Sequence, residues 1–485
     1  MSKFLSRSTF EEPLERGYRL LPFRMSRLLD SRYLITNEAG EHLKIDETEL
    51  ADLVNHGLAS NSSAYGDLKS KHFLIDEDST VALQLLGLKV RTKIRRLADF
   101  TALHMFVVSL RCEHSCPYCQ VSRQSNDKVA YDMSEETARK ALDLAFRSPS
   151  PNIKIEFQGG EPLLNFERVK QIVTSGEELN LRAKRNLQFV IATNLALVTD
   201  EILEFCRAHK VIISTSLDGP ADLHNANRPR PGGNSHQLVE ANLVRTRNAI
   251  GHENVSALMT TTKKSLSKPR EIIDEYLRLE FPGIFLRPLS PYGFAVKTKS
   301  FASYQADEWL DFYFDGLDYV IELNLAGIFF KEFMATTILK KILTPYATSY
   351  VDLMSPAGIG IAAVVYNYDG DVYASDEGRM LAEMGDQTFK LGNVHHNTYE
   401  EIFTSEALLK PLEESLTRSV PMCSECAFEP FCGAEPVYHH ATQGDFIGHK
   451  PTSGFCNRNM AIFNRLFTLL DDPQKRPVLE SWVFQ

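Results

Sequence analysis

The sequence predicts an α/β protein built on a parallel sheet, with a smaller domain before it and another after it. Between residues 100 and 290, short β-rich runs alternate with stretches of helical spacing, as in repeated βα units. Cysteines form two groups, one directly after the first of these runs and one near the C-terminus. The length of 485 residues corresponds, as a soft prior, to roughly three domains.

Composition narrows the class of protein. Hydrophobic residues make up 43% of the chain and charged residues 24%, so it can bury real cores and is not disordered. The formal net charge of -10 argues against general nucleic-acid binding. The first 30 residues lack an apolar signal segment, and no run of about 18 apolar residues exists. We therefore expect a cytoplasmic protein with no membrane partner, in which grouped cysteines bind metal rather than form disulfides.

Residues 1–96 precede the repeated units and predict a domain of strands followed by helices. Short strands are expected at Phe23–Leu28, Tyr33–Thr36 and His42–Ile45. Asp46 and Glu49 have the spacing of a capping box, so a helix should begin directly after the third strand.

Six β-rich runs follow, and helical segments such as Ser134–Arg147 and Asn165–Leu181 lie between them. In parallel sheets ligands bind beyond the carboxyl ends of the strands, so the residues after each run are the informative ones. The predicted strands are Met105–Leu110, Ile153–Phe157, Leu187–Ala192, Val211–Ser216, Val255–Thr260 and Ile284–Arg287.

The first cysteine group follows the first predicted strand, with the spacing Cys112-x3-Cys116-x2-Cys119 and an aromatic residue, Tyr118, before the last cysteine. Three thiolates can hold three irons of a [4Fe–4S] cube and leave the fourth iron open to a substrate, whereas four thiolates would fill the cube. Zinc sites also use C-x2-C pairs, so zinc remains an alternative.

Three further motifs stand at strand ends. Gly159-Gly160-Glu161-Pro162 follows the second strand, where the glycines allow a close approach to the backbone. Thr193-Asn194 follows the third strand. Ser216-Leu217-Asp218-Gly219-Pro220, then His224 and Arg228, follow the fourth.

The three-cysteine loop and the Gly-Gly-Glu-Pro motif resemble those of the radical S-adenosylmethionine (SAM) superfamily. The resemblance implies a partial (β/α)6 barrel over residues 97–300, which binds SAM on a [4Fe–4S] cluster held by Cys112, Cys116 and Cys119. The SAM contacts that it implies lie at the strand ends and in the cluster loop: Tyr118, Gly159, Gly160, Glu161, Thr193, Asn194, Ser216, Asp218 and Arg228.

The late cysteines Cys423, Cys426, Cys432 and Cys456 can fill one zinc site or one [4Fe–4S] cluster. Beside such a barrel they resemble the SPASM extension of peptide-modifying enzymes, which usually binds two auxiliary clusters through seven cysteines. Ser375 and Pro436 stand where that family has cysteines of the inner cluster. We therefore expect a helical linker over 301–355 and a SPASM-like domain over 356–485 with one fully ligated auxiliary cluster.

Asp376 is the candidate acid or base. In the related anaerobic sulfatase-maturating enzymes, an aspartate that directly follows the corresponding cysteine position accepts a proton. The alternative interpretation is a solvated Asp376-Glu377 pair in a turn.

The N-terminal domain resembles the winged-helix peptide-recognition domain of enzymes that modify ribosomally made peptides, which bind a leader peptide at a sheet edge. Four phrases are similar to the His-Xaa-Ser-system radical SAM maturases: Leu20–Arg24, Tyr33–Glu41, Lys69–Leu74 and Tyr373–Arg379.

This resemblance implies an enzyme that modifies a precursor peptide with His-Xaa-Ser repeats, by a side-chain crosslink at Cβ. Its partners would be the precursor, an electron donor such as flavodoxin or ferredoxin, and a second radical SAM protein. Two alternatives remain open at this point. One is oxidation of a serine or cysteine on a protein, as in sulfatase maturation, and the other is a binding protein with structural zinc.

Overall fold

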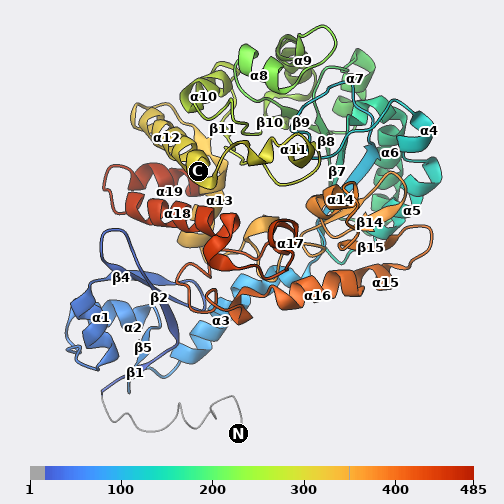
Figure 1. Cartoon of the computed structure of the whole chain (residues 1–485). Coiled ribbons are helices and arrows are strands. Elements are labelled where there is room, and N and C mark those ends of the chain that lie inside the picture. The colour runs from blue at the N-terminus through green and yellow to red at the C-terminus, as the bar shows by residue number, and fades with distance from the viewer. Residues whose placement is uncertain (1–16, 349) are drawn as a thin grey trace.

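The central feature of the computed structural model is an eight-stranded sheet in the order β10-β9-β8-β7-β6-β13-β14-β15 (Figure 1). The structure describes residues 17–348 and 350–485, so residues 1–16 of the predicted N-terminal domain lie outside the described residues. Strands β6 to β10 are parallel neighbours, as predicted. The strands are β6 Leu103–Ser109, β7 Asn152–Gly159, β8 Asn186–Thr193, β9 Ile212–Ser216, β10 Val255–Leu258, β13 Ala363–Tyr366, β14 Asp371–Tyr373 and β15 Lys390–Asn393.

Helices cover the outside of the parallel strands and bury an apolar face against them (Figure 1). The predicted start at Ser134 is confirmed, because its side chain accepts a hydrogen bond from the N–H of Thr137 (3.1 Å) at the N-terminus of α5. These helices are α5 Glu135–Ala145, α6 Phe166–Ala183, α7 Asp200–Ala208, α8 Ala221–Asn227, α9 Ser235–Ile250 and α10 Pro269–Arg278. Two short helices, α4 Lys128–Tyr131 and α11 Phe294–Lys297, belong to the segments that follow β6 and β11.

The sixth predicted strand is short and pairs outside the central sheet. β11 (Gly283–Ile284) lies parallel to β12 (Lys331–Glu332) in a separate two-stranded sheet. The buried carboxylate of Glu332 accepts a hydrogen bond from the N–H of Leu286 (3.2 Å). A side chain thus takes the place of the next backbone hydrogen bond between β11 and β12. The chain therefore leaves the sheet early and crosses toward the cysteine loop.

The N-terminal domain has its own core and its own antiparallel sheet, β2-β3-β4. The capping box of Asp46 and Glu49 is present at the start of the first helix, as predicted. A second pair of strands, β1 and β5, is antiparallel. The elements are β1 Arg19–Leu20, β2 Phe23–Arg27, β3 Tyr33–Asn37, β4 His42–Ile45, β5 Leu74–Ile75, α1 Glu47–Val54, α2 Ser63–Ser70 and α3 Ala82–Ile94.

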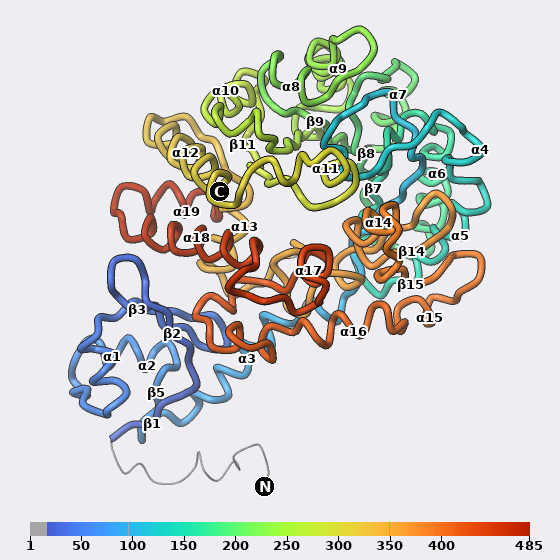
Figure 2. The backbone as a smooth tube through the Cα atoms, in the orientation of Figure 1, coloured from blue at the N-terminus to red at the C-terminus, as the bar shows by residue number. Residues whose placement is uncertain are grey.

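The C-terminal part is joined to the barrel by backbone pairing, because β13 lies parallel to β6 and β14 and β15 follow it. The remaining helices pack beside the barrel and against the N-terminal domain (Figure 2). They are α12 Ala306–Leu325, α13 Phe333–Leu343, α14 Asp376–Ala382, α15 Tyr399–Phe403, α16 Glu406–Glu414, α17 Pro436–Gln443, α18 Gly454–Leu469 and α19 Arg476–Phe484. In the described part of the chain, no helix combines the length and apolar character needed to cross a membrane.

Candidate active site

The three-cysteine loop leaves the carboxyl end of β6 and is anchored at its base. Arg111 is 4% exposed and pairs with Asp132 (2.7 Å), and its guanidinium also donates to the carbonyl of Leu164 (2.7 Å). On the far side of the loop, the N–H of Phe294 donates to the carbonyl of Cys119 (2.7 Å). The loop is therefore held from both sides, while the thiols of Cys112, Cys116 and Cys119 remain partly exposed.

The chemistry of these thiols fits a metal cluster. Burial raises the pKa of Cys116 to about 12, against the opposing effect of Arg228, and burial also raises the pKa of Cys112. Free thiols in this environment stay protonated at neutral pH, whereas a bound metal ion deprotonates them. The loop is thus suited to hold a cationic cluster.

The two glycines at the end of β7 are required because the backbone at the end of β6 and directly after it comes very close. A side chain on Gly159, whose φ is +139°, would lie 1.9 Å from the carbonyl oxygen of Ser109, and one on Gly160 would lie 2.3 Å from that of Arg111. The Gly160 and Glu161 N–H groups donate to the same two carbonyls (2.8 Å each). The close approach that the structure shows is therefore between two strand ends, whereas the sequence prediction concerned the approach of a ligand to this backbone.

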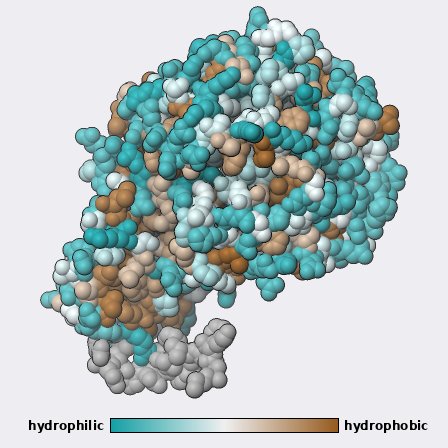
Figure 3. Space-filling view, viewed as in Figure 1, coloured by the Kyte–Doolittle hydropathy of each residue, from teal (hydrophilic) through white to brown (hydrophobic). Residues whose placement is uncertain are grey.

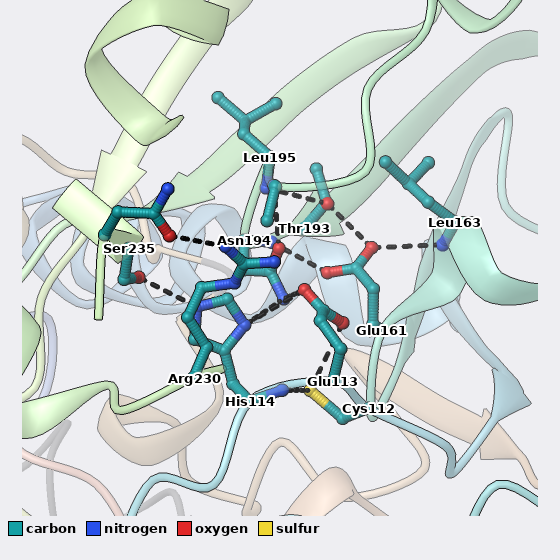
Figure 4. Close-up of polar contacts among 12 residues, drawn as sticks. Cys112, Glu113, His114, Glu161, Leu163, Thr193, Asn194, Leu195, Arg230 and Ser235 are labelled. Atoms are coloured by element: carbon teal, nitrogen blue, oxygen red, sulfur yellow. Dashed lines mark hydrogen bonds and ion pairs between the residues drawn. The ribbon is translucent and has the colours of Figure 1, made fainter. Parts of the chain in front are cut away.

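Glu161 clamps the ends of β7 and β8 together (Figure 4). Its carboxylate accepts hydrogen bonds from the Thr193 hydroxyl (2.7 Å), the Asn194 N–H (2.9 Å) and the Leu163 N–H (3.0 Å). Burial, followed by the nearby Glu113 charge, raises its pKa to about 7. The structure therefore brings Glu161, Thr193 and Asn194 together, with the carboxylate directed at protein donors.

Asn194 extends this clamp to the cysteine loop. Its side-chain N–H₂ donates to Glu113 Oε1 (2.8 Å), directly after Cys112, and it also lies 3.0 Å from His114 Nδ1 (Figure 4). The position of the first cysteine is thereby coupled to the ends of β7 and β8.

Asp218 is the centre of a second buried group. It is fully buried, accepts a hydrogen bond from the Tyr118 hydroxyl (2.6 Å) and pairs with Arg228 (3.1 Å). The Arg228 guanidinium also lies over the Tyr118 ring, 5.6 Å from its centroid. Ser216 ends β9 just before this group. Asp218 thus orients both Arg228 and the aromatic residue of the cysteine loop.

Sequence reasoning missed the links between these two groups. His114 Nε2 lies 2.8 Å from the Ser235 hydroxyl, and His224 Nε2 lies 3.0 Å from the same oxygen. The N–H of Asp218 donates to His224 Nδ1 (3.2 Å). The signal available was the position of His114 inside the cysteine motif, whereas nothing in the sequence marked Ser235.

Asp376 lies in the first turn of α14, a helix that contacts the end of the cysteine loop. Arg379 Nε donates to its carboxylate (3.0 Å), and the same guanidinium donates to the carbonyl of Val121 (3.4 Å), two residues after Cys119. Ser375 caps the helix through the N–H of Gly378 (3.1 Å). The structure therefore ties Asp376 to the end of the cysteine loop through one buried arginine.

The four late cysteines gather between the 421–432 loop and the start of α18. Burial is the main cause that raises their pKa values, and neighbouring thiols add to it for Cys423, Cys426 and Cys432. A zinc ion with four sulfurs at about 2.3 Å would require sulfur-to-sulfur distances of about 3.8 Å. Among the described residues, the only three potential ligand groups within 4.8 Å of one another are Cys112, Glu113 and His114. The wider spacing of the late cysteines suits a cluster better than one zinc ion.

Comparison with known proteins agrees with this geometry. Residues 106–275 match the model of the radical SAM superfamily. The chain carries a radical SAM domain. It is therefore an enzyme, and its cofactors are SAM and iron–sulfur clusters, which overturns the alternative of a zinc-containing binding protein.

Two relatives show how far the similarity reaches. A cysteine-type anaerobic sulfatase-maturating enzyme of Clostridium novyi is 21% identical over 370 residues, which cover 73% of this chain and 92% of that protein. An uncharacterised protein of Methanocaldococcus jannaschii is 32% identical over 131 residues, which cover 27% of this chain and 43% of that protein. The second match thus spans less than half of that relative.

Two solved structures share the fold. The anaerobic sulfatase-maturating enzyme anSMEcpe with bound AdoMet superposes with a TM-score of 0.63 at 18% identity, covering 79% of this chain and 99% of that one. Streptococcus suis SuiB bound to its precursor peptide SuiA superposes with a TM-score of 0.53 at 13% identity, covering 91% and 99%. These likenesses confirm the predicted fold class, a radical SAM barrel with a cysteine-rich C-terminal part.

Proposed function

We propose that this enzyme modifies a ribosomally synthesised precursor peptide, with His-Xaa-Ser repeats as its substrate and a side-chain crosslink at Cβ as its product. The observation that carries the proposal is the N-terminal domain, which presents an unoccupied apolar helix beside a small sheet. α3 has no buried residue, and Leu83, Leu85 and Leu88 are 42%, 44% and 55% exposed. Apolar residues gather on this domain in Figure 3.

A leader peptide is the occupant that suits this surface. The β2-β3-β4 sheet has two edge strands, to which an extended peptide can add by main-chain hydrogen bonds. The apolar side chains of α3 would then receive alternate side chains of the leader. The relative SuiB was solved with its precursor peptide, which supports a peptide substrate for a chain of this fold.

In this proposal Cys112, Cys116 and Cys119 hold the SAM-binding cluster, and Cys423, Cys426, Cys432 and Cys456 hold one auxiliary cluster. When bound, these groups supply a 5′-deoxyadenosyl radical that removes a hydrogen atom, and an acceptor for the surplus electron. The residues that would contact SAM lie at the strand ends, in the cysteine loop and directly after α8: Tyr118, Gly159, Gly160, Glu161, Thr193, Asn194, Ser216, Asp218 and Arg228.

The protein's own part in the reaction is to position groups and to take a proton. Glu161 fixes the ends of β7 and β8, and Asp218 fixes Arg228 and Tyr118. Asp376, held by Arg379, accepts the proton that leaves the substrate when the new bond forms. A crosslink removes two hydrogens in all, one as an atom and one as a proton with an electron.

The remaining parts of the proposal concern the cell. An electron donor such as flavodoxin or ferredoxin reduces the first cluster, and a second radical SAM protein acts on the same precursor. The enzyme works in the cytoplasm, where free thiols and reduced clusters persist.

Mass spectrometry of a co-expressed His-Xaa-Ser precursor tests the proposal. We expect a product two hydrogens lighter, and a Cys112→Ala variant that makes neither this product nor 5′-deoxyadenosine from SAM and dithionite. An unchanged mass with epimerised residues would exclude the crosslink.

A second candidate is oxidation of a serine or cysteine on a protein substrate. It is favoured by the Clostridium novyi relative, of which the match covers 92%. Oxidation of a serine to an aldehyde also removes two hydrogens, so there the fragment masses decide. A cysteine converted to the same aldehyde also exchanges its sulfur for a water oxygen, so its total mass already differs. Oxidation places the loss on one residue, whereas a crosslink joins two residues and suppresses fragmentation between them.

A further inference from the structure

A small cavity lies between the barrel and the C-terminal part, beside the cysteine loop. It has a volume of about 50 Å³, and charged and phenolic side chains from five different segments line it. The lining residues on which the argument depends are Arg287, Tyr292, Asp352, Glu377, Glu435 and Arg458.

The cavity adjoins the reaction centre through one short segment. Gln120 donates to the carbonyl of Ser290 (3.4 Å), and Phe294 donates its N–H to the carbonyl of Cys119 (2.7 Å). Tyr292 lies between these two anchors. Glu377, which also lines the cavity, directly follows Asp376. Because the cavity adjoins the cysteine loop, a peptide substrate that lies at this loop could place one of its side chains in the cavity.

Acidic groups outnumber basic groups in the cavity, with three carboxylates against two guanidinium groups. Arg287 approaches Glu377 only to 3.8 Å, and Arg458 lies over the rings of Tyr438 and Trp309. Burial, followed by the charges of Asp352 and Asp376, raises the pKa of Glu377 to about 7. Burial and the charges of Asp352 and Glu377 likewise raise the pKa of Glu435. A cation would relieve this repulsion.

Tyr292 points to a ligand independently of the acidic groups. The residue is 1% exposed and lines the cavity, yet its hydroxyl has no hydrogen-bond partner among the described residues. A buried polar group without a partner is costly, so a hydroxyl left open toward a cavity marks a place where a ligand can bond.

The size and the walls select the kind of cation. One water needs about 10–15 Å³ by this measure, so the cavity takes roughly four heavy atoms, close to an imidazole or guanidinium group. Tyr292, Tyr350 and Tyr438 supply aromatic walls, which favour a flat cation. Among the described residues of the cavity, no three ligand atoms lie within 4.8 Å of one another, as a preformed metal site would require.

We infer that this cavity binds a flat cationic side chain, imidazolium or guanidinium, of the peptide substrate next to the reacting residue. This inference rests on the proposed function and names the side-chain class that the site selects. Glu377 and Glu435 bind the cation, and the Tyr292 hydroxyl accepts the remaining hydrogen bond from one of its N–H groups.

The test is a binding measurement on the full-length protein with its clusters, using small probes by ligand-observed NMR. Methylguanidinium is the cation, methylurea its neutral counterpart of the same shape, and acetate the anion. We expect millimolar binding of methylguanidinium, and at least tenfold weaker binding of methylurea and acetate. Glu377→Gln and Glu435→Gln should each weaken methylguanidinium binding about tenfold.

The matched control is Glu383→Gln, because Glu383 directly follows the same helix, is partly buried and does not line the cavity. Its binding should equal that of the unmodified protein. Equal binding of methylurea, or unchanged binding in both cavity variants, overturns the inference. If one variant fails to fold, the other variant and the methylurea comparison still decide.

This outcome is separable from that of the proposed function. Probe binding needs no turnover, so a peptide maturase without a cation site shows product but no methylguanidinium binding. Conversely, probe binding without any modified peptide leaves the cavity established and the maturase proposal refuted.

Discussion

Asp218 shows at the scale of a single residue how the cysteine loop is held. Its carboxylate is fully buried and satisfies both Tyr118 and Arg228. Removing one partner of a buried ion pair costs about 3–5 kcal/mol, because the other charge stays buried and unpaired. The carboxylate is therefore a structural requirement of the loop, in addition to its place in the proposed SAM site.

Asp218→Asn should lower the free energy of unfolding by about 3 kcal/mol, since the shape is kept and only the charge is lost. The matched control is Asp222→Asn, four residues later, which breaks an exposed pair with Lys268 (2.5 Å) and should cost at most about 1 kcal/mol. Chemical denaturation of both variants measures the difference. Equal losses would show that Asp218 and Arg228 do not act as a buried pair.

His104 makes the stability of the barrel depend on pH. It is fully buried in β6 between the Tyr366 hydroxyl (3.2 Å) and the Thr101 carbonyl (3.1 Å), and burial lowers its pKa to about 4. In the unfolded chain its pKa is about 6.5, so only the unfolded state gains a proton as the pH falls from 6.5 toward 4. Its contribution is fully present above pH 6.5 and is lost below it.

His104→Gln keeps both hydrogen bonds and removes the titration. Between pH 7.5 and 5, we expect the original protein to lose about 2 kcal/mol more stability than this variant does. Thermal unfolding of both proteins at the two pH values measures it. Parallel losses would mean that His104 is not the titrating group.

At the residue scale, the sequence predicted candidate positions but not their partners. The three cysteines and Glu161 were marked as candidates because they follow predicted strand ends, and Arg228 because it belongs to the motif after the fourth strand. That Glu161 satisfies Thr193 and Asn194, and that Arg228 pairs with Asp218, depends on the register between strands. That register cannot be recognised from a single sequence.

At the scale of elements, α3 is notable because it contains several apolar side chains and yet buries none of its residues. Four leucines lie within six residues of this helix, and three of them, Leu83, Leu85 and Leu88, are exposed. Single exposed apolar residues are ordinary, but several on one helix beside a sheet edge indicate a surface for a partner. The proposed occupant is the leader peptide.

Leu88→Asp should therefore weaken leader binding at least tenfold and leave the fold intact, because the side chain is 55% exposed. Leu181→Asp is the matched control, since Leu181 is 78% exposed on α6 of the barrel. Fluorescence anisotropy with a labelled leader of a precursor that the enzyme converts measures both. A leader bound equally by the two variants contradicts the assignment of α3.

At the scale of the whole molecule, local patterns predicted most elements but not how distant segments join. Five predicted strands lie in the central sheet because each is a short β-rich run before a helix. The pairing of β13 with β6 joins segments about 260 residues apart, and no local pattern marks it. The N-terminal sheet likewise contacts the late cysteine loop, where Thr36 donates to the carbonyl of Ala427 (2.8 Å) and Arg24 to that of Ser424 (2.8 Å).

Through these contacts the N-terminal domain packs on the loop that carries the proposed auxiliary-cluster ligands. The final prediction follows from this arrangement. Two cubes correspond to about eight irons per chain, so Cys456→Ser should leave about four. Because Ser424 and Ala427 lie among the ligands Cys423 and Cys426, losing the cluster should also loosen the loop on which the N-terminal domain rests. Limited proteolysis should then cut faster between α2 and β6.

Cys206→Ala is the control, because Cys206 is buried in the barrel core and should not affect iron content. Cys116→Ser should also leave about four irons, but with the N-terminal domain still protected. Iron analysis and proteolysis of the three variants thus separate a cluster that performs chemistry from one that holds domains together. The same protection in Cys456→Ser and Cys116→Ser would show that the late cysteines do not support the N-terminal domain, even if they bind iron.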